Sequence, residues 1–226
     1  MGTDIHVCVE RRVNGVWNAV LKTRGYSKED SLYWLDIDRN YSLFAILADV
    51  RNGFGFAGCD TGDGFVPISK PRGLPPDVSA KILRDYDEGW GHSISWLTLQ
   101  EILDYDWTQI TKRRGWVNGI EYFNWIQYNR RLGESPDSWS GGMYGPDIKH
   151  ITVAEMDEEI KKIEQQNSHY HDQIKAIEET LKNVYCKVEW EQPYYKCCRR
   201  FWSDVIPQLL RLGKPEDVRL VFWFDN

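Results

Sequence analysis

Apolar residues recur at alternating spacings of three and four from residue 153 to residue 184. This heptad pattern is typical of a coiled coil, in which the repeated positions form the seam between two helices. The helix has a defined start, because Thr152 and Glu155 form a capping box. We therefore expect one long helix that pairs protomers. Its seam residues are Met156, Ile160, Ile163, Asn167, Tyr170, Ile174, Ile177 and Leu181.

Asn167 occupies the central a position of this seam. A single asparagine at such a position fixes the register of a coiled coil and favours two parallel strands. Glu159 and Glu164 would face each other as like charges in a parallel pair, so an antiparallel pair stays open. The seam predicts a homodimer or higher homo-oligomer through 153–184. The alternative is a long helix whose apolar stripe packs on the chain's own globular domain.

The net charge of the chain argues against one class of protein, those that bind nucleic acid over an extended surface. The formal net charge is −6, whereas an extended nucleic-acid surface needs a basic field. A small anionic ligand held by a few arginines remains compatible with this charge.

The five cysteines include no Cys-x-x-Cys pair, so the sequence indicates no disulfide framework and no structural zinc. With no signal peptide and no membrane-spanning apolar run, we expect a protein of a reducing cytoplasm that has no membrane partner.

Two strand patterns define the expected fold. Residues 4–22 alternate apolar and polar side chains around Asn14-Gly15, which is a type I′ turn signal. Residues 218–224 form an almost continuous apolar run, which suits a central strand buried on both faces. We expect this final strand to close its sheet beside the N-terminal hairpin.

The expected fold class is α+β, with an N-terminal β-hairpin and a buried C-terminal strand in one mixed sheet. A single globular domain would comprise 1–150 and 186–226, interrupted by a long coiled-coil-type helical arm at 151–185. Other expected segments are helices over 41–51, 119–132 and 194–212, and a long Gly- and Pro-rich loop over 53–76.

Five segments of the chain stand out together: MGTDIHVCVE with VNGVW, RNYSLFAILADVRNG, PISKPRGLPPDVS, GHSISWLTLQE and VRLVFWFDN. They resemble a family of small, mostly uncharacterised proteins encoded by bacteriophages and prophages. The resemblance covers most of 1–105 and the last strand. It implies a setting, the cytoplasm of an infected bacterium, where small phage proteins often counter host defence. It supplies no catalytic residues to transfer to this chain.

Arginine, serine and aromatic residues gather in the predicted loops 51–76 and 90–97 and around 39–41. Arginine binds phosphate through a bidentate fork, and serines ahead of a helix N-terminus donate to phosphate oxygens. Aromatic rings stack on a base or ribose. We expect a pocket for a nucleotide-like ligand; the alternative is that the arginines pair with nearby acids. The candidates are Arg39, Asn40, Tyr41, Arg51, Asn52, Arg72, His92, Ser93, Ser95 and Trp96.

The predicted function is counter-defence by binding and sequestering a cyclic dinucleotide or ADP-ribose-type immune signal, without a cofactor. A phosphodiesterase-like enzyme using His92 and His6 is one alternative, so enzymatic activity stays open. A coiled-coil module that inhibits a host protein is another. Asp4 with the same two histidines is compatible with a metal site, but three residues in one unaligned sequence do not establish it, and no metal is predicted.

Overall fold

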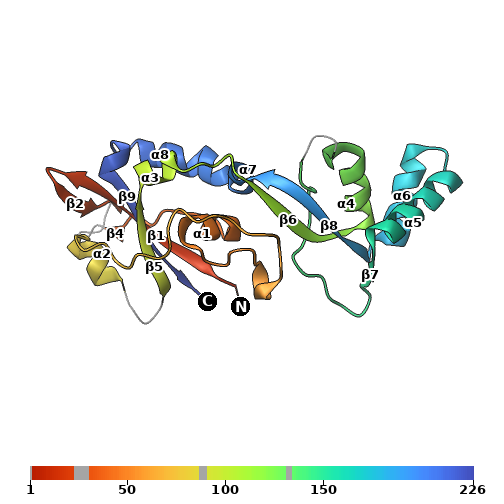
Figure 1. Cartoon of the computed structure of the whole chain (residues 1–226), viewed down its shortest axis with the longest axis horizontal. Helices are drawn as coiled ribbons and strands as arrows, with labels where there is room; N and C mark the ends of the chain where they lie inside the picture. Colours follow the sequence, from red (N-terminus) through yellow and green to blue (C-terminus); the bar gives the residue numbers. More distant parts are fainter. Residues whose placement is uncertain (1, 23–30, 87–90, 131–133) are drawn as a thin grey trace. The chain divides into compact units, whose positions relative to one another are not determined.

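The computed structural model describes residues 2–22, 31–86, 91–130 and 134–226. The chain separates into two compact units, each with its own sheet (Figure 1). The first unit comprises Met1–Asn52, Phe65–Gln109 and Tyr194–Asn226, and the second comprises Gly53–Gly64 and Ile110–Pro193. The helices that were expected to form a separate arm therefore lie inside the second unit. The expected α+β class is confirmed in this coarse form.

The first unit is built on an antiparallel sheet with the strand order β2-β1-β9-β5. The strands are β1 (Asp4–Val13), β2 (Val16–Ala19), β5 (His92–Thr98) and β9 (Val218–Asp225). Asn14 and Gly15 have φ values of 50° and 82°, as a type I′ turn requires. Strand β9 lies between β1 and β5 and is buried up to Phe224. The predicted hairpin and the predicted buried terminal strand are both confirmed.

Helices cover both faces of this sheet. The helical segments are α1 (Tyr41–Ala48), α2 (Ala80–Asp85), α3 (Leu99–Asp104), α7 (Tyr194–Cys197), the π-helical η4 (Phe201–Val205), α8 (Ile206–Leu210) and the 3₁₀ turn η5 (Pro215–Asp217). A short ribbon pairs β3 (Leu21–Lys22) with β4 (Ser31–Leu32). Helix α1 shares one hydrophobic cluster with Phe222 and Phe224 of β9. On the other face, Ile82 of α2 shares a second cluster with Val221 and Trp223.

Helix α1 ends earlier than the expected residue 51. Asp49 adopts the left-handed conformation with φ 59°, and its N–H bonds to the carbonyls of Ala45 and Phe44. This is a helix-ending motif in which the next residues can no longer continue the helix. The helical stretch expected over 194–212 is present in three pieces, with the π-helical η4 directly before Ile206-Pro207.

The second unit has a three-stranded sheet in the order β6-β8-β7. Strands β6 and β8 are antiparallel, whereas the short β7 runs parallel to β8. Its segments are β6 (Ile110–Asn118), β7 (Lys149–Ile151), β8 (Val184–Pro193), α4 (Gly119–Asn124), the π-helical η2 (Trp125–Asn129), α5 (Val153–Gln166), α6 (Tyr170–Leu181) and the 3₁₀ turn η1 (Phe56–Gly58). The helix expected over 119–132 corresponds to α4 and η2, and residues 131 and 132 lie outside the described residues.

The prediction of one long coiled-coil helix is wrong. The chain leaves the helical conformation at Asn167, which has φ −127° and ψ 112° and caps α5. Helices α5 and α6 instead contact each other and the second sheet. Five of the eight seam residues are buried in one cluster with Val188 and Trp190 of β8: Met156, Ile160, Ile163, Ile177 and Leu181. The buried part of the stripe covers the chain's own sheet, whereas homo-oligomerisation through 153–184 stays a prediction.

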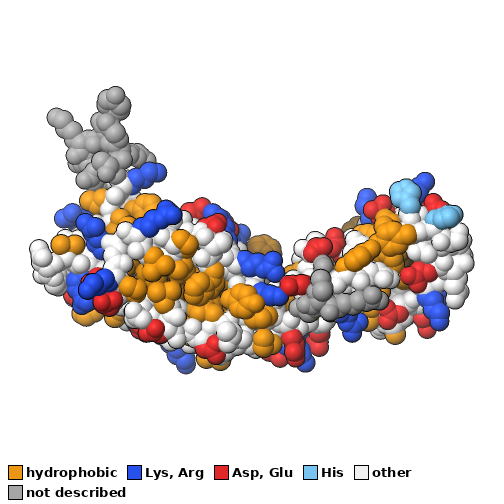
Figure 2. Space-filling model, turned by 90° about the horizontal axis from the view of Figure 1, so that it is seen from above, with side chains coloured by type: hydrophobic (Ala, Val, Ile, Leu, Met, Phe, Trp, Pro, Cys, Tyr) orange, Lys and Arg blue, Asp and Glu red, His pale blue; other side chains and the backbone are white. Residues whose placement is uncertain are grey.

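Charged side chains of both signs are distributed over both units. On the face shown in Figure 2, Lys and Arg side chains alternate with Asp and Glu side chains and form no continuous basic field over the described residues. No helix in the described parts of the chain is both long and apolar enough to cross a membrane.

Candidate functional site

Polar side chains gather where β1 begins, β9 ends and β5 begins. These three strands are neighbours and antiparallel, so Asp4 lies opposite Asp225 and His92 lies opposite Phe224. Helix α1 and the segments on either side of it add Arg39, Tyr41 and Arg51 to this group. We call the group the strand-end cluster: Thr3, Asp4, His6, Arg39, Tyr41, Arg51, His92, Asp225 and Asn226.

The two histidines of the cluster lie on opposite faces of the sheet. Directly opposed residues share a face, whereas successive residues alternate. The His6 ring stacks on Trp223 at 5.8 Å between centroids, on the α2 face. The His92 ring stacks on Phe224 at 6.0 Å, on the α1 face. The residues proposed for an enzyme or a metal site therefore do not share a face, and the described residues contain no group of three potential metal ligands.

Arg51 is the centre of the network on the α1 face. Its Nε donates to Thr3 Oγ1 at 2.8 Å, and its Nη2 donates to Asn226 Oδ1 at 3.3 Å. Thr3 Oγ1 donates to the same Asn226 oxygen at 2.7 Å, and the Thr3 N–H donates to the Tyr41 hydroxyl. The Arg51 guanidinium also lies 5.7 Å from the centre of the Tyr41 ring. These contacts hold the guanidinium in a fixed orientation at the end of the sheet.

His92 presents an unsatisfied ring nitrogen on the same face. Its Nδ1 lies 2.9 Å from Ser93 Oγ, whereas its Nε2 is buried without a hydrogen-bond partner among the described residues. Ser93 has φ 54°, and the pairing with β9 is irregular between His92 and Ser95. A buried unpaired polar atom costs about 1–3 kcal/mol. A ligand atom that reached Nε2 would remove this cost.

An ion pair occupies the exposed rim of the cluster. Arg39 donates two hydrogen bonds to Asp4, at 2.7 and 2.6 Å, and both side chains are about half exposed. The hydrogen bond from Arg39 holds the pKa of Asp4 below its usual value, against the opposing effect of desolvation. Arg39 is therefore oriented by a carboxylate, the group that most resembles a phosphate in its acceptor geometry.

His6 makes a second acid–base contact on the α2 face. Its Nε2 lies 2.9 Å from Asp225 Oδ2, and both side chains are partly exposed. The imidazole is flanked by Trp223, which stacks on it, and by Trp34, which meets it edge-on at 6.1 Å. The carboxylate and the two indoles hold the ring in one orientation with part of its surface open to solvent.

Asn40 and Asn52, both predicted to bind a ligand, have structural roles in the first unit. Asn40 caps α1, since its Oδ1 accepts the N–H groups of residues 42 and 43, and its Nδ2 donates to the Cys197 carbonyl. Asn52 accepts the Phe65 N–H and donates to the Phe65 carbonyl. These contacts use the amide groups that ligand binding would need.

Arg72, Ser95 and Trp96 form a separate group. Arg72 donates to Glu101 at 2.7 Å and lies 5.1 Å from the Trp96 ring centre, while Ser95 Oγ accepts the Arg72 N–H. Residues 92–98 form β5 rather than a turn ahead of a helix. At the start of α3 the Glu101 carboxylate accepts hydrogen bonds from Thr98, so the expected anion position there is filled by the chain itself.

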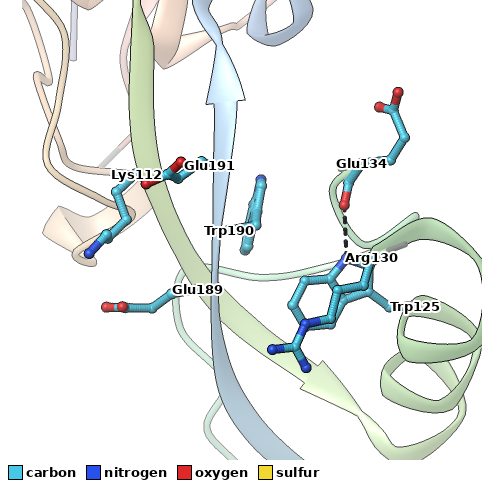
Figure 3. A pocket seen from close by; sticks show the side chains of 7 residues that line it. All are labelled: Lys112, Trp125, Arg130, Glu134, Glu189, Trp190 and Glu191. Carbon is cyan, nitrogen blue, oxygen red and sulfur yellow. Dashed lines mark hydrogen bonds between the residues drawn. The ribbon is translucent and has the colours of Figure 1, made fainter. Parts of the chain in front are cut away.

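A groove in the second unit contains residues that the sequence patterns do not single out (Figure 3). Its cavity has a volume of about 310 Å³, within the range of ligand sites. Trp125 Nε1 donates to the Glu134 carbonyl, and the Arg130 guanidinium lies 5.4 Å from a Trp125 ring centre. The alternation of charged and apolar residues over 187–191 is the one sequence signal that points to this region. The lining residues are Lys112, Trp125, Arg130, Glu134, Glu189, Trp190 and Glu191.

Comparisons with known proteins do not assign this chain to a family. No protein-family model, curated protein or solved structure was found to match it. The resemblance to bacteriophage proteins therefore stays a prediction from the sequence segments alone.

Proposed function

We propose that the chain binds a small phosphate-bearing ligand of the nucleotide type at the strand-end cluster and sequesters it. One observation carries the proposal: residues predicted from separate segments, Arg39 with Tyr41, Arg51 and His92, occupy the same end of one sheet. Arginines suit phosphate, an aromatic ring suits a base or ribose, and a buried ring nitrogen suits a polar base atom. In the setting that the phage resemblance implies, the ligand is a cyclic dinucleotide or an ADP-ribose-type immune signal.

The Arg39–Asp4 pair can exchange partners at low cost. An exposed ion pair contributes only about 0–1 kcal/mol to stability, and a phosphate offers Arg39 the same bidentate geometry as Asp4. A phosphate would then displace the Asp4 carboxylate, while Arg51 is already oriented by Thr3 and Asn226. Asp4 acts in this arrangement as an internal competitor of the ligand.

This competition predicts that substitutions of Arg39 and of Asp4 change the ligand affinity in opposite directions. Calorimetric titration with cyclic dinucleotides and ADP-ribose should show binding that weakens about 10- to 100-fold in Arg39→Gln, because charge-assisted hydrogen bonds are lost. Asp4→Asn should tighten binding, because it removes the competing charge. Arg12→Gln is the matched control, since Arg12 forms an exposed pair with Asp217 elsewhere in the first unit. Absence of binding by the folded wild-type protein, or equal losses in Arg39→Gln and Arg12→Gln, would overturn the proposal.

Hydrolysis of a nucleotide-type ligand on the α2 face of the cluster is a second candidate, favoured by the His6–Asp225 contact of 2.9 Å. A carboxylate that orients an imidazole is a common arrangement for a general base. Mass spectrometry after prolonged incubation and heat denaturation separates the two functions. Sequestration returns the intact ligand, whereas an enzyme returns products whose formation stops in His6→Gln and continues in the control His171→Gln, an exposed histidine of α6.

A further inference from the structure

Strand β8 has an edge that its short neighbour leaves largely uncovered. Strand β7 pairs with β8 only at residues 184–186, whereas β8 continues to Pro193. On its other side β8 pairs with β6 as far as Pro193. From Lys187 onward, the edge of β8 that faces away from β6 has no strand partner among the described residues.

The hydrogen bonds of β6 show which backbone groups of β8 point toward that edge. Alternate residues of β6 exchange backbone hydrogen bonds with residues 61–63 and 140, on the side away from β8. They are Lys112, Arg114 and Trp116. In an antiparallel ladder the residues opposite them also point away from the pair. These residues of β8 are Glu191, Glu189 and Lys187.

The groove of the second unit is lined in part by this uncovered stretch of β8, through Glu189, Trp190 and Glu191. In Figure 3, Trp125, Arg130 and Glu134 stand on one side of β8, with Trp190 between them and the strand, and the Lys112, Glu189 and Glu191 side chains stand on the other. Both indoles are almost fully buried, so they form an apolar floor rather than an exposed stacking surface. Among the lining side chains, carboxylates outnumber cations by three to two. The groove therefore combines directed backbone groups, an apolar floor and a slight excess of negative charge.

We propose that this groove binds an extended peptide that adds to β8 as a further strand. The peptide backbone would bond with residues 187, 189 and 191, in the manner of β-strand addition. Because successive side chains of a strand alternate between faces, a basic residue would meet Glu191 while apolar residues meet the indole floor. Glu189 on the same face already lies 3.6 Å from the Arg114 guanidinium. Charged side chains on an exposed strand edge discourage non-specific pairing with strands of other chains. On β8 the glutamates would favour a peptide strand that carries positive charge. This site uses no residue of the strand-end cluster.

Short peptides of defined sequence test this site in the full-length protein. We expect a peptide of alternating arginine and valine to bind in calorimetric titration, and one of alternating glutamate and valine to bind at least tenfold more weakly. Two N-methylated forms of the first peptide, one methylated at the odd-numbered amides and one at the even-numbered amides, identify the bonded edge. Binding should weaken at least tenfold in the form whose methylated amides face β8. That chemical change removes backbone donors and keeps the charge, so it reports strand addition rather than attraction between side chains.

Protein variants localise the binding to the groove. Glu191→Lys should weaken binding of the arginine–valine peptide at least tenfold, whereas Glu158→Lys, an equal charge change on the exposed side of α5, should leave it unchanged. Circular dichroism checks that both variants are folded. The proposal is overturned if wild-type protein does not bind the peptide, if neither N-methylated form is weakened, or if the two variants lose affinity equally.

Discussion

Among single residues, Arg219 shows most directly how a charge is accommodated inside this fold. It lies in the buried terminal strand and is 2% exposed, next to Glu10, which is fully buried. Its Nε donates to Glu10 at 2.6 Å, its Nη1 donates to Asp77 at 2.7 Å, and its guanidinium lies 4.1 Å from a Trp17 ring centre. The charge is thus paired, hydrogen-bonded and covered by an aromatic face, which are the conditions that a buried ion requires.

Removing this side chain should be far more costly than removing an exposed arginine. We expect Arg219→Ala to lower the free energy of unfolding by about 3–5 kcal/mol, because Glu10 would stay buried without its partner. Arg12→Ala, which breaks the exposed pair with Asp217, should cost about 1 kcal/mol or less. Urea unfolding at neutral pH measures both. Similar losses in the two variants would show that the buried pair has no special role.

Among the secondary-structure elements, the apolar stripe over 153–184 shows which structural features can be predicted from hydrophobic periodicity and which cannot. Spacings of three and four identify a helix face that is buried, but they do not identify the surface that covers it. The break lies at Asn167 and Ser168, and both residue types favour caps and turns over helix interiors. The Asn167 amide donates to the Ile163 carbonyl and closes α5. The same asparagine that would set the register of a coiled coil here ends a helix.

This packing predicts that the stripe stabilises the monomer rather than a pair of protomers. Ile160→Ala should lower the free energy of unfolding by about 2–5 kcal/mol, because Ile160 is almost fully buried in the second unit's core. The molecular mass in solution should not change. Lys161→Ala, on the exposed side of the same helix, is the control. Light scattering and thermal unfolding at several concentrations test this, and a mass that falls only in Ile160→Ala would restore the coiled-coil interpretation.

For the whole molecule, the parts predictable from sequence are those fixed by short-range patterns. The β-hairpin, the capping box at the start of α5 and the buried terminal strand follow from residues that are close in sequence. The second sheet does not, because β6 contains the charged run Lys112-Arg113-Arg114, which hides its alternation. Arg113 is buried by stacking over Trp139 at 5.1 Å, a contact set by tertiary structure.

The sequence predicts some residues of the candidate site, but it does not predict which of them lie together. Arg39 and Tyr41 stand out in the sequence at a loop and a helix start. Tyr41 lies against Arg51 and Arg39 pairs with Asp4, while strand pairing places Asp4 and His92 at the same end of the sheet. Arg72 stands out for the same chemical reasons, yet it pairs with Glu101 on another part of the first unit. Residue type thus indicates which side chains suit a ligand, whereas strand register decides which of them meet. Register depends on pairings between residues far apart in sequence, and short-range patterns do not specify it.

The division into two units predicts two unfolding transitions. Each unit has its own sheet and its own buried clusters, and four chain crossings connect them, after residues 52, 64, 109 and 193. Separate cores unfold separately unless an extensive interface couples them. In scanning calorimetry, Arg219→Ala should lower one transition temperature and Ile160→Ala the other. A single transition that either variant shifts would show that the units unfold as one. Independent transitions would mean that the ligand of the first unit stabilises only its own transition, and that the peptide of the second unit stabilises only the other.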